Sequence, residues 1–361
     1  MLRVFRLSCL IGAAAMLMGA VALRDDNPPP DALRQLYAGA PASWPRPMLH
    51  DGAVFEEFGA LAPRPKLEGR EAALAALGEK LFNEPGLSGS GQIACASCHN
   101  RELGFGDGLR TSFGHDRKRG TRNAQPLFTA AWMHELFWDG RAPSLEAQSH
   151  LPIENPVEMA GEIAAAERWV NRQPGYRAEF EAVFGPGRID IDHVASALGA
   201  FQRTLRPPRS KWDRMLEAGP QAFSDQELLG LHLFRTKAGC ANCHNGPLFS
   251  DQRYHNLQIS FYGRRLEDLG RYTVTKDPVD VGRFRTPSLR AVRRTGPFMH
   301  NGIFPTLVGV VNMYNGGGGR DRQTPSEISP GVPVPQPDPL LKRLDLTGEE
   351  RAALVAFLET L

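Results

Sequence analysis

Four of the five cysteines occur in two copies of one pattern. The first copy is Cys95-Ala-Ser-Cys98-His99, and the second is Cys240-Ala-Asn-Cys243-His244. The pattern C-x-x-C-H is typical of covalent haem c attachment, in which two thioethers hold the porphyrin and the adjacent histidine is the proximal ligand of the iron. A zinc site or a thioredoxin-like redox pair is the alternative. Each copy has only one adjacent histidine and no βαβ pattern around it, so we predict two covalently bound haem c groups.

The composition excludes other classes of protein. The chain has 361 residues, a net charge of +2 and 42% hydrophobic residues, which is typical of a soluble protein of about two domains. A charge so near zero, without a dense basic stripe, argues against nucleic-acid binding. With Cys9 in the N-terminal apolar segment, no cysteine of the mature chain is left over for a disulfide.

The N-terminal sequence has the pattern of a targeting segment. Two arginines within residues 1–6 precede the apolar stretch 7–23, which ends in Ala20-Val21-Ala22. This pattern predicts a signal peptide over residues 1–22 and a periplasmic location, with an uncleaved membrane anchor as the alternative. The Pro-rich and polar segment 23–65 is expected to form an extended arm or linker.

Helical signals surround both motif copies. Apolar residues recur at helical spacing from Leu67 to Phe82, before the first copy. Capping boxes at 224–227 and 347–350 predict the starts of two further helices. A Gly- and Pro-rich loop, residues 315–339, separates the second copy from the last helix.

The segment Arg206-Pro207-Pro208-Arg209 interrupts the chain between the two copies. We therefore predict an all-α fold with long loops, made of two cytochrome c-like helical domains that each carry one covalent haem. The N-terminal domain spans residues 66–210 and the C-terminal domain spans residues 211–361.

The second axial position of each iron decides the chemistry. An iron with both positions held by the protein only passes electrons, whereas an open or releasable position can bind peroxide. Spacing alone leaves many candidates open, namely His115, His134, His150, His255, His300, Met299, Met313 and Tyr314.

Longer segments on both sides of both motifs resemble the bacterial dihaem cytochrome c peroxidase family, including its MauG branch. The resemblance extends over about residues 67–361. It is carried by LSGSGQIACASCHN (87–100), GFGDG (104–108), GTRNAQPLF (120–128), FWDGRAPSLEAQ (137–148), PIENPVEM (152–159), GCANCHNGPLF (239–249), RTPSLRAV (285–292), GPFMHNG (296–302) and VVNMYNGGG (310–318).

The resemblance implies roles for particular residues around the N-terminal, peroxidatic haem. Glu158 corresponds to the distal acid–base residue, and Gln148 and Pro152 to residues that line the same distal pocket. Such a carboxyl takes the proton from peroxide and returns it to the leaving oxygen. Trp138 corresponds to the tryptophan that assists electron transfer between the haems.

The resemblance also implies a calcium ion between the haem domains. Asn123 would bind it through the side chain, and Thr295 and Pro297 through backbone carbonyls. Hard oxygen ligands of this kind suit Ca²⁺.

Two residues point to different branches of the family. His115 lies where gated peroxidases carry a distal histidine that caps the peroxidatic iron until the second haem is reduced. Tyr314 lies where ordinary members carry the methionine ligand of the electron-transfer haem, and tyrosine there marks the MauG branch. Met313 and Met299 are the alternatives to Tyr314. A phenolate favours higher oxidation states of iron, whereas a thioether favours the reduced state.

We therefore expect a periplasmic dihaem c-type peroxidase that reduces hydrogen peroxide at the N-terminal haem with electrons from the C-terminal haem. A small cytochrome c or a cupredoxin would be the electron donor, and a homodimer is compatible with the resemblance. One alternative is a MauG-like enzyme that uses high-valent iron to oxidise a partner protein or another substrate. Two further alternatives are a pure electron-transfer dihaem cytochrome and a haem-based redox sensor.

Overall fold

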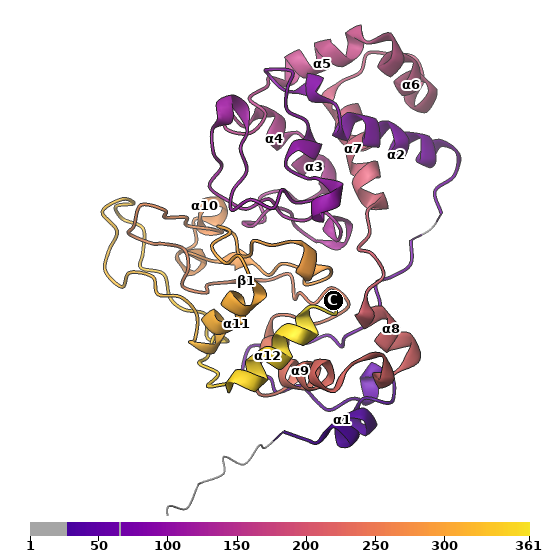
Figure 1. Ribbon diagram of the computed structural model, residues 1–361. Helices are drawn as coiled ribbons and strands as arrows, with labels where there is room; N and C mark the ends of the chain where they lie inside the picture. The colour runs from indigo at the N-terminus through magenta and orange to yellow at the C-terminus, as the bar shows by residue number, and fades with distance from the viewer. Residues whose placement is uncertain (1–26, 65) are drawn as a thin grey trace, which may run out of the picture.

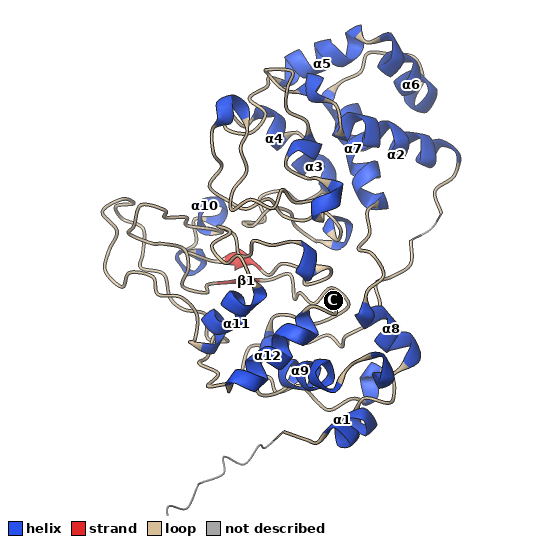
Figure 2. Cartoon of the chain, in the orientation of Figure 1, coloured by secondary structure: helices blue, strands red, loops and turns tan. Residues whose placement is uncertain are grey.

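The computed structural model describes residues 27–64 and 66–361. The predicted signal peptide, residues 1–22, and the membrane anchor considered as its alternative lie outside this part of the chain. The described chain is helical, and its one sheet pairs strand β1 (Tyr254–His255) with strand β2 (Phe284–Arg285) in antiparallel fashion (Figure 2). The predicted all-α class is therefore confirmed.

Two groups of helices lie at opposite ends of the molecule (Figure 1). The first group contains α2 (Gly69–Phe82), α3 (Leu145–Ser149), α4 (Leu151–Glu154), α5 (Ile163–Arg172), α6 (Pro174–Phe184) and α7 (Ile191–Thr204). The second contains α1 (Pro30–Leu36), α8 (Lys211–Ala218), α9 (Asp225–Arg235), α11 (Leu307–Asn315) and α12 (Gly348–Leu358). The short helix α10 (Tyr272–Thr275) lies among the loops. Each group encloses its own apolar core.

The expected helix starts and breaks are present. The helix predicted over residues 67–82 is α2, and the two capping boxes cap α9 and α12. The predicted interruption at residues 206–209 separates α7 from α8. Residues 316–346 contain no helix or strand, as expected for the Gly- and Pro-rich loop.

Each motif copy is preceded by a helix that crosses another helix at a glycine. A Cβ on Gly78 of α2 would lie 1.9 Å from the carbonyl oxygen of Ala197 in α7. A Cβ on Gly230 of α9 would lie 2.0 Å from the carbonyl oxygen of Ala353 in α12. Only glycine lets the two backbones approach so closely. The same helix crossing is therefore built twice, once ahead of each C-x-x-C-H sequence.

The segment expected to be an arm or linker is largely packed in place. The described part, residues 27–64, forms α1 and contributes Tyr37, Trp44 and Phe58 to the core of the second helix group. Trp44 meets Trp212 edge to face at 5.9 Å, and Phe58 stacks on Phe249 at 4.8 Å. The described part of the expected extended arm or linker is therefore packed against the second helix group, because these buried aromatic side chains outweigh the Pro-rich composition.

Residues 48–56 lie directly on the second motif copy. The buried side chain of Asn242 accepts a hydrogen bond from the His50 backbone N–H at 2.7 Å and donates to the Met48 carbonyl at 3.2 Å. Asn245 accepts from Glu56 N–H at 3.1 Å and donates to the Val54 carbonyl at 2.9 Å. Residues 48–56 are therefore hydrogen-bonded along the second motif copy and hold it in place.

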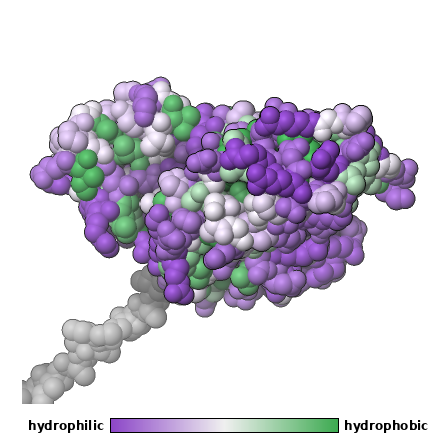
Figure 3. Space-filling model, turned by 90° about the horizontal axis from the view of Figure 1, so that it is seen from above, coloured by the Kyte–Doolittle hydropathy of each residue, from purple (hydrophilic) through white to green (hydrophobic). Residues whose placement is uncertain are grey.

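No helix in the described part of the chain is long and apolar enough to cross a membrane. The face of the molecule seen in Figure 3 is mostly hydrophilic, and its hydrophobic residues occur in small scattered groups.

The glycine crossings lead to a prediction for stability. Gly78→Ala should lower the free energy of unfolding by roughly 1–3 kcal/mol, because the added Cβ must push α2 away from α7. Gly175→Ala in α6 is the matched control, because a Cβ there meets nothing within 4 Å, and this change should be neutral or slightly stabilising. Denaturant unfolding of the mature protein measures both. Equal unfolding midpoints for the two variants would contradict the close crossing.

Candidate haem centres

The two motif copies fold into the same local shape. Cys95–Ser97 and Cys240–Asn242 each form a single 3-10 turn. The backbone N–H of His99 donates to the Cys95 carbonyl at 3.0 Å, and that of His244 donates to the Cys240 carbonyl at 2.9 Å. Residues spaced by three and four in such a turn share one side. Both cysteines and the histidine of each copy are therefore presented together.

The two histidine rings are held in the same way. Nδ1 of His99 lies 2.9 Å from the Phe105 carbonyl oxygen, and Nδ1 of His244 lies 2.9 Å from the Phe249 carbonyl oxygen. A carbonyl only accepts, so Nδ1 carries the proton and Nε2 keeps its lone pair. Burial lowers the pKa of both histidines and keeps them neutral. A neutral imidazole with a fixed Nδ1–H is the form that binds a metal through Nε2.

The cysteines do not fit the alternative chemistries. Burial raises the pKa of Cys95 and Cys240 to about 12, and no disulfide joins the described cysteines. Thiols that stay protonated are poor redox nucleophiles, which argues against a thioredoxin-like pair. They remain available for the two thioether bonds that hold a haem c.

The second motif copy opens onto a cavity. The cavity encloses about 1620 Å³ that no protein atom fills, part of it open to solvent, and its wall includes Cys240, Cys243 and His244. Tyr314, near the end of α11, lines the same cavity, and so does Met299. Burial raises the pKa of the Tyr314 phenol well above its ordinary value. Met313 is not in the cavity wall, because the neighbouring position on α11 points elsewhere.

The first motif copy has a carboxyl group beside it. Glu158 follows α4, and burial raises its pKa, while the charge of Arg141 and a 2.9 Å hydrogen bond from the Asn155 amide act in the opposite direction. The charge of Glu158 is close enough to raise the pKa of Cys98, although burial of Cys98 contributes more. This sequence-predicted acid therefore lies within electrostatic reach of the first motif.

His115 lies next to Glu158. Its backbone N–H donates to the Glu158 carbonyl at 2.8 Å. The preceding Gly114 touches the backbone of residues 157–158, where a Cβ would lie 2.1 Å from the Val157 carbonyl oxygen. Nδ1 of His115 is buried without a hydrogen-bond partner, and Nε2 lies 3.3 Å from an Asp116 carboxylate oxygen.

Gln148 and Pro152 belong to the same local unit as Glu158. Gln148 lies in α3 and Pro152 in α4, the two short helices that lead into the Glu158 turn. The Pro152 carbonyl accepts the Met159 N–H at 3.2 Å, which closes that turn. The described residues give the Gln148 side chain no hydrogen bond, so its amide is available.

Trp138 lies where the two helix groups meet. Its indole N–H donates to the Asn123 carbonyl at 3.0 Å, and its ring meets His300 edge to face at 6.4 Å. Asn123 N–H in turn donates to the His300 carbonyl at 2.7 Å. Trp138 also lines the cavity of the second motif, so the indole reaches from the N-terminal segment into the C-terminal cavity.

The three residues expected at a calcium site are all in the wall of this cavity. Asn123, Thr295 and Pro297 all line this same cavity. The Asn123 amide nitrogen donates to the Leu109 carbonyl at 2.9 Å, and no hydrogen bond among the described residues reaches its Oδ1. The available amide oxygen of Asn123 is a hard ligand of the kind that Ca²⁺ prefers.

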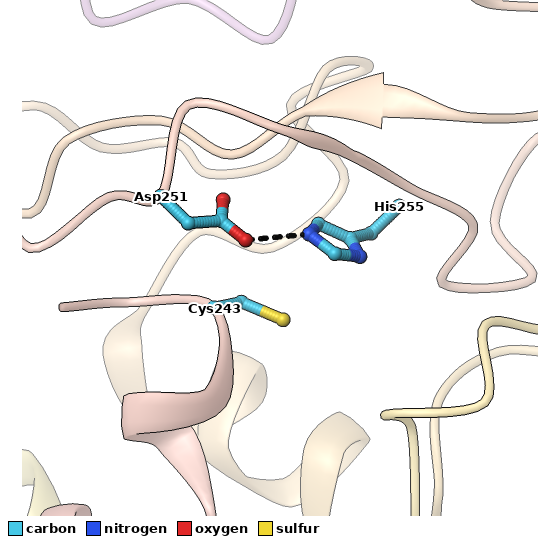
Figure 4. A group of neighbouring side chains, drawn as sticks. All are labelled: Cys243, Asp251 and His255. Carbon is cyan, nitrogen blue, oxygen red and sulfur yellow. Dashed lines mark hydrogen bonds and ion pairs between the residues drawn. The ribbon is translucent and has the colours of Figure 1, made fainter. Parts of the chain in front are cut away.

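His255 is excluded as an iron ligand by its partners. Nε2 of His255 lies 2.9 Å from an Asp251 carboxylate oxygen (Figure 4). Nδ1 lies 2.8 Å from an Asp338 carboxylate oxygen. Burial lowers the pKa of His255, but these carboxylates outweigh it and raise the pKa to about 12. Cys243, Asp251 and His255 lie close enough to hold a metal ion. Both ring nitrogens are already occupied by carboxylates, however, so the imidazolium has no lone pair to offer.

The remaining histidine candidates are placed differently. His300 is buried and stacked on Phe284 at 3.5 Å, and burial lowers its pKa to about 3. It lines the second cavity, whereas His134 is exposed and neither His134 nor His150 lines that cavity. Sequence reasoning missed Asp251 and Asp338, because 83 residues separate Asp338 from His255 and no motif marks the pair.

Comparisons with known proteins agree with this geometry. A profile described as di-haem cytochrome c peroxidase matches residues 72–221. Cytochrome-c peroxidase IdrP1 of Denitromonas iodatirespirans is 38% identical over 340 residues, which cover 86% of this chain and 87% of the relative. The methylamine utilization protein MauG of Methylorubrum extorquens is 36% identical, with coverage of 83% and 81%. The crystal structure of a MauG-like protein associated with microbial copper homeostasis matches with a TM-score of 0.72 and 30% identity, over 83% of this chain and 93% of that one.

The fold and the duplicated haem motif define a c-type cytochrome enzyme, a peroxidase-type oxidoreductase. The chain belongs to the di-haem cytochrome c peroxidase family, as the sequence segments predicted. The family implies two haem c groups, and its members include proteins named cytochrome-c peroxidase and proteins named MauG.

The environment of Glu158 leads to a prediction for stability against pH. Its folded-state pKa lies above the ordinary value of 4.5, so ionisation at higher pH disfavours the fold. Glu158→Gln should therefore be more stable than the parent protein above pH 4.5. The difference should grow until the pH passes the folded-state pKa and then stay constant. Glu154→Gln, at an exposed position four residues earlier, is the control. Parallel stability curves for Glu158→Gln and the parent across pH 4–8 would disprove the raised pKa.

Proposed function

We propose that this chain is a periplasmic dihaem peroxidase that reduces hydrogen peroxide at the haem of the first motif and receives electrons through the haem of the second. Cys95, Cys98 and His99 would hold the first haem, and Cys240, Cys243 and His244 the second. The domain division at 66–210 and 211–361 is part of the proposal, and the two separate apolar cores support it.

The observation that carries the proposal is the difference between the two motif surroundings. The histidine and cysteines have the same local shape in both copies. A half-buried carboxyl, Glu158, stands beside the first copy, whereas a buried phenol, Tyr314, shares the cavity of the second. The surroundings of the first copy would therefore supply a proton acceptor, and those of the second would supply a further ligand to the iron.

Haem iron with one open position binds and cleaves peroxide, which takes up two electrons and two protons to give two molecules of water. Glu158 as carboxylate would accept the proton of the bound peroxide and return it to the leaving oxygen. Gln148 and Pro152 would line the space that holds the substrate. The Asn155 amide orients the Glu158 carboxyl through its hydrogen bond to Oε1.

His115 would cap the first iron in the resting protein and withdraw on activation. Its unpartnered buried Nδ1 supports this role, and its backbone bond to Glu158 would couple its movement to the acid. Trp138 would carry electrons between the haems. Its hydrogen bond to Asn123, its contact with His300 and its place in the wall of the second cavity support that assignment. Asn123, Thr295 and Pro297 would hold a Ca²⁺ ion near it.

A second candidate function is favoured by Tyr314. If the phenol ligates the second iron, that haem is tuned towards higher oxidation states. The protein would then oxidise a partner protein or another substrate, a MauG-like role. With methionine as the ligand, a small cytochrome c or a cupredoxin would be the electron donor instead. The cavity wall contains Tyr314 and Met299 but not Met313, which supports tyrosine over its neighbour.

Loss of the distal acid tests the peroxidase proposal. Glu158→Gln should keep both haems and lower peroxide-dependent turnover by about 10²-fold or more, because the proton transfer loses its acceptor. Haem content and steady-state peroxide consumption measure the two effects, with Glu154→Gln as the control. Parent-like turnover of Glu158→Gln would remove this residue from its role. Parent protein that consumes no peroxide would favour a pure electron-transfer cytochrome or a redox sensor.

Substitution of the phenol tests the ligand set. Tyr314→Phe should change the electron paramagnetic resonance signal of one low-spin haem in the oxidised protein and leave the other unchanged. Met313→Leu should leave both signals unchanged, because Met313 does not line the cavity. A spectrum that responds to Met299→Leu but not to Tyr314→Phe would assign the position to methionine and favour the ordinary peroxidase branch.

A further inference from the structure

Arg285 differs from the other buried arginines in its partners. Arg235, Arg285 and Arg290 are each at most 4% exposed. Arg235 pairs with Glu57, and Arg290 pairs with Asp213. Among the described residues, no carboxylate lies within 4 Å of the Arg285 guanidinium. This residue alone of the three therefore buries a charge without an acidic partner.

The contacts of the Arg285 guanidinium leave part of it unsatisfied. Nε donates to the Phe137 carbonyl at 3.2 Å, and Nη1 points at the Met133 sulfur, a weak acceptor, at 2.7 Å. No hydrogen bond among the described residues involves Nη2. The backbone N–H of Arg285 donates to the Trp138 carbonyl at 2.8 Å. One residue therefore holds both carbonyls of the Phe137–Trp138 segment and still has donors to spare.

A buried guanidinium without an anion is costly. Burial lowers the pKa of Arg285 only to about 10, so the group stays charged at neutral pH. Removal of a charge from water costs several kcal/mol unless an opposite charge compensates for it. The charge of Glu135 raises the pKa of Arg285 and offsets part of this cost, but Glu135 pairs with Arg271 and accepts a hydrogen bond from Tyr254. No carboxylate of the described residues contacts the Arg285 guanidinium, so an anion from outside the chain fits here.

The position of Arg285 identifies the kind of anion. Arg285 lines the cavity that also contains Cys240, Cys243 and His244. Strand β2 places it there, and its cross-strand partner in β1 is Tyr254. A haem attached at these cysteines brings two carboxylates of its own, the propionates. A guanidinium pairs well with a carboxylate in such surroundings.

We propose that Arg285 binds a propionate of the second haem and is a positioning residue that links this haem to the Phe137–Trp138 segment. The inference rests on the proposed function, because it needs the haem at Cys240 and Cys243. The positive charge would also stabilise the reduced iron and so raise the reduction potential of this haem. Arg285 would thus affect both the reduction potential of the second haem and the position of Trp138.

A pair of substitutions separates charge from packing. Arg285→Gln removes the charge and keeps a hydrogen-bond donor, and Arg285→Lys keeps the charge. Arg283→Met is the matched control, because Arg283 lies two residues earlier and outside this cavity wall. Potentiometric titration of the holoprotein measures the reduction potential of each haem. In Arg285→Gln the potential of one haem should fall by at least 59 mV, which is a tenfold change in its one-electron reduction equilibrium. Arg285→Lys and Arg283→Met should stay near the parent value.

Resonance Raman spectra identify the anion. The propionate bending vibration of one haem should change in Arg285→Gln and not in Arg283→Met. Equal shifts of potential in the glutamine and lysine variants would show that packing matters and would overturn the proposal. An unchanged propionate vibration would do the same, because the anion would then be a solvent ion. Parent protein that contains two haems but consumes no peroxide would reject the proposed function and leave the Arg285 test intact.

Discussion

Each haem motif depends on one hydrogen bond from a histidine ring to a backbone carbonyl. In both copies Nδ1 donates to a phenylalanine carbonyl at 2.9 Å. Phe105 and Phe249, which supply these carbonyls, have left-handed backbones with φ of 59° and 52°. A bulky residue adopts this conformation only where its surroundings enforce it. The buried, aromatic cores on which these loops rest therefore fix the tautomer of the histidine, and with it the nitrogen that faces the iron.

The two copies share this frame but differ in what surrounds it. The positions of Asn242 and Asn245 in the second copy correspond to Ser97 and Asn100 in the first. The two asparagines of the second copy are buried and form hydrogen bonds with residues 48–56. Ser97 and Asn100 of the first copy are exposed and form hydrogen bonds only with nearby residues. The second motif copy is therefore held by a distant segment of the chain, whereas the first copy lies closer to solvent.

The junction between the helix groups is held by charge as well as by packing. Arg122 donates to Asp139 at 2.6 Å and to both oxygens of Asp268, at 2.7 and 2.8 Å. Asp139 directly follows Trp138, so this ion network fixes the chain beside the indole. Half-buried, bidentate pairs of this kind are geometrically demanding. The tryptophan is thus held from the N-terminal side by Asn123 and from the C-terminal side by Arg285.

The sequence by itself determined the local features: the two C-x-x-C-H copies, the helix starts at the capping boxes, the break at residues 206–209 and the family. These follow from short-range patterns, in which spacing along the chain reflects spacing in a turn or helix. The sequence did not reveal that residues 27–64 pack into a core, because their buried aromatic residues find partners such as Trp212 and Phe249 many positions away. Tertiary structure alone decided that His255 lies between Asp251 and Asp338, that Tyr314 rather than Met313 lines the second cavity, and that Arg285 has no acidic partner. Such contacts join residues many positions apart, and burial, which sets their charges, exists only once the chain has folded.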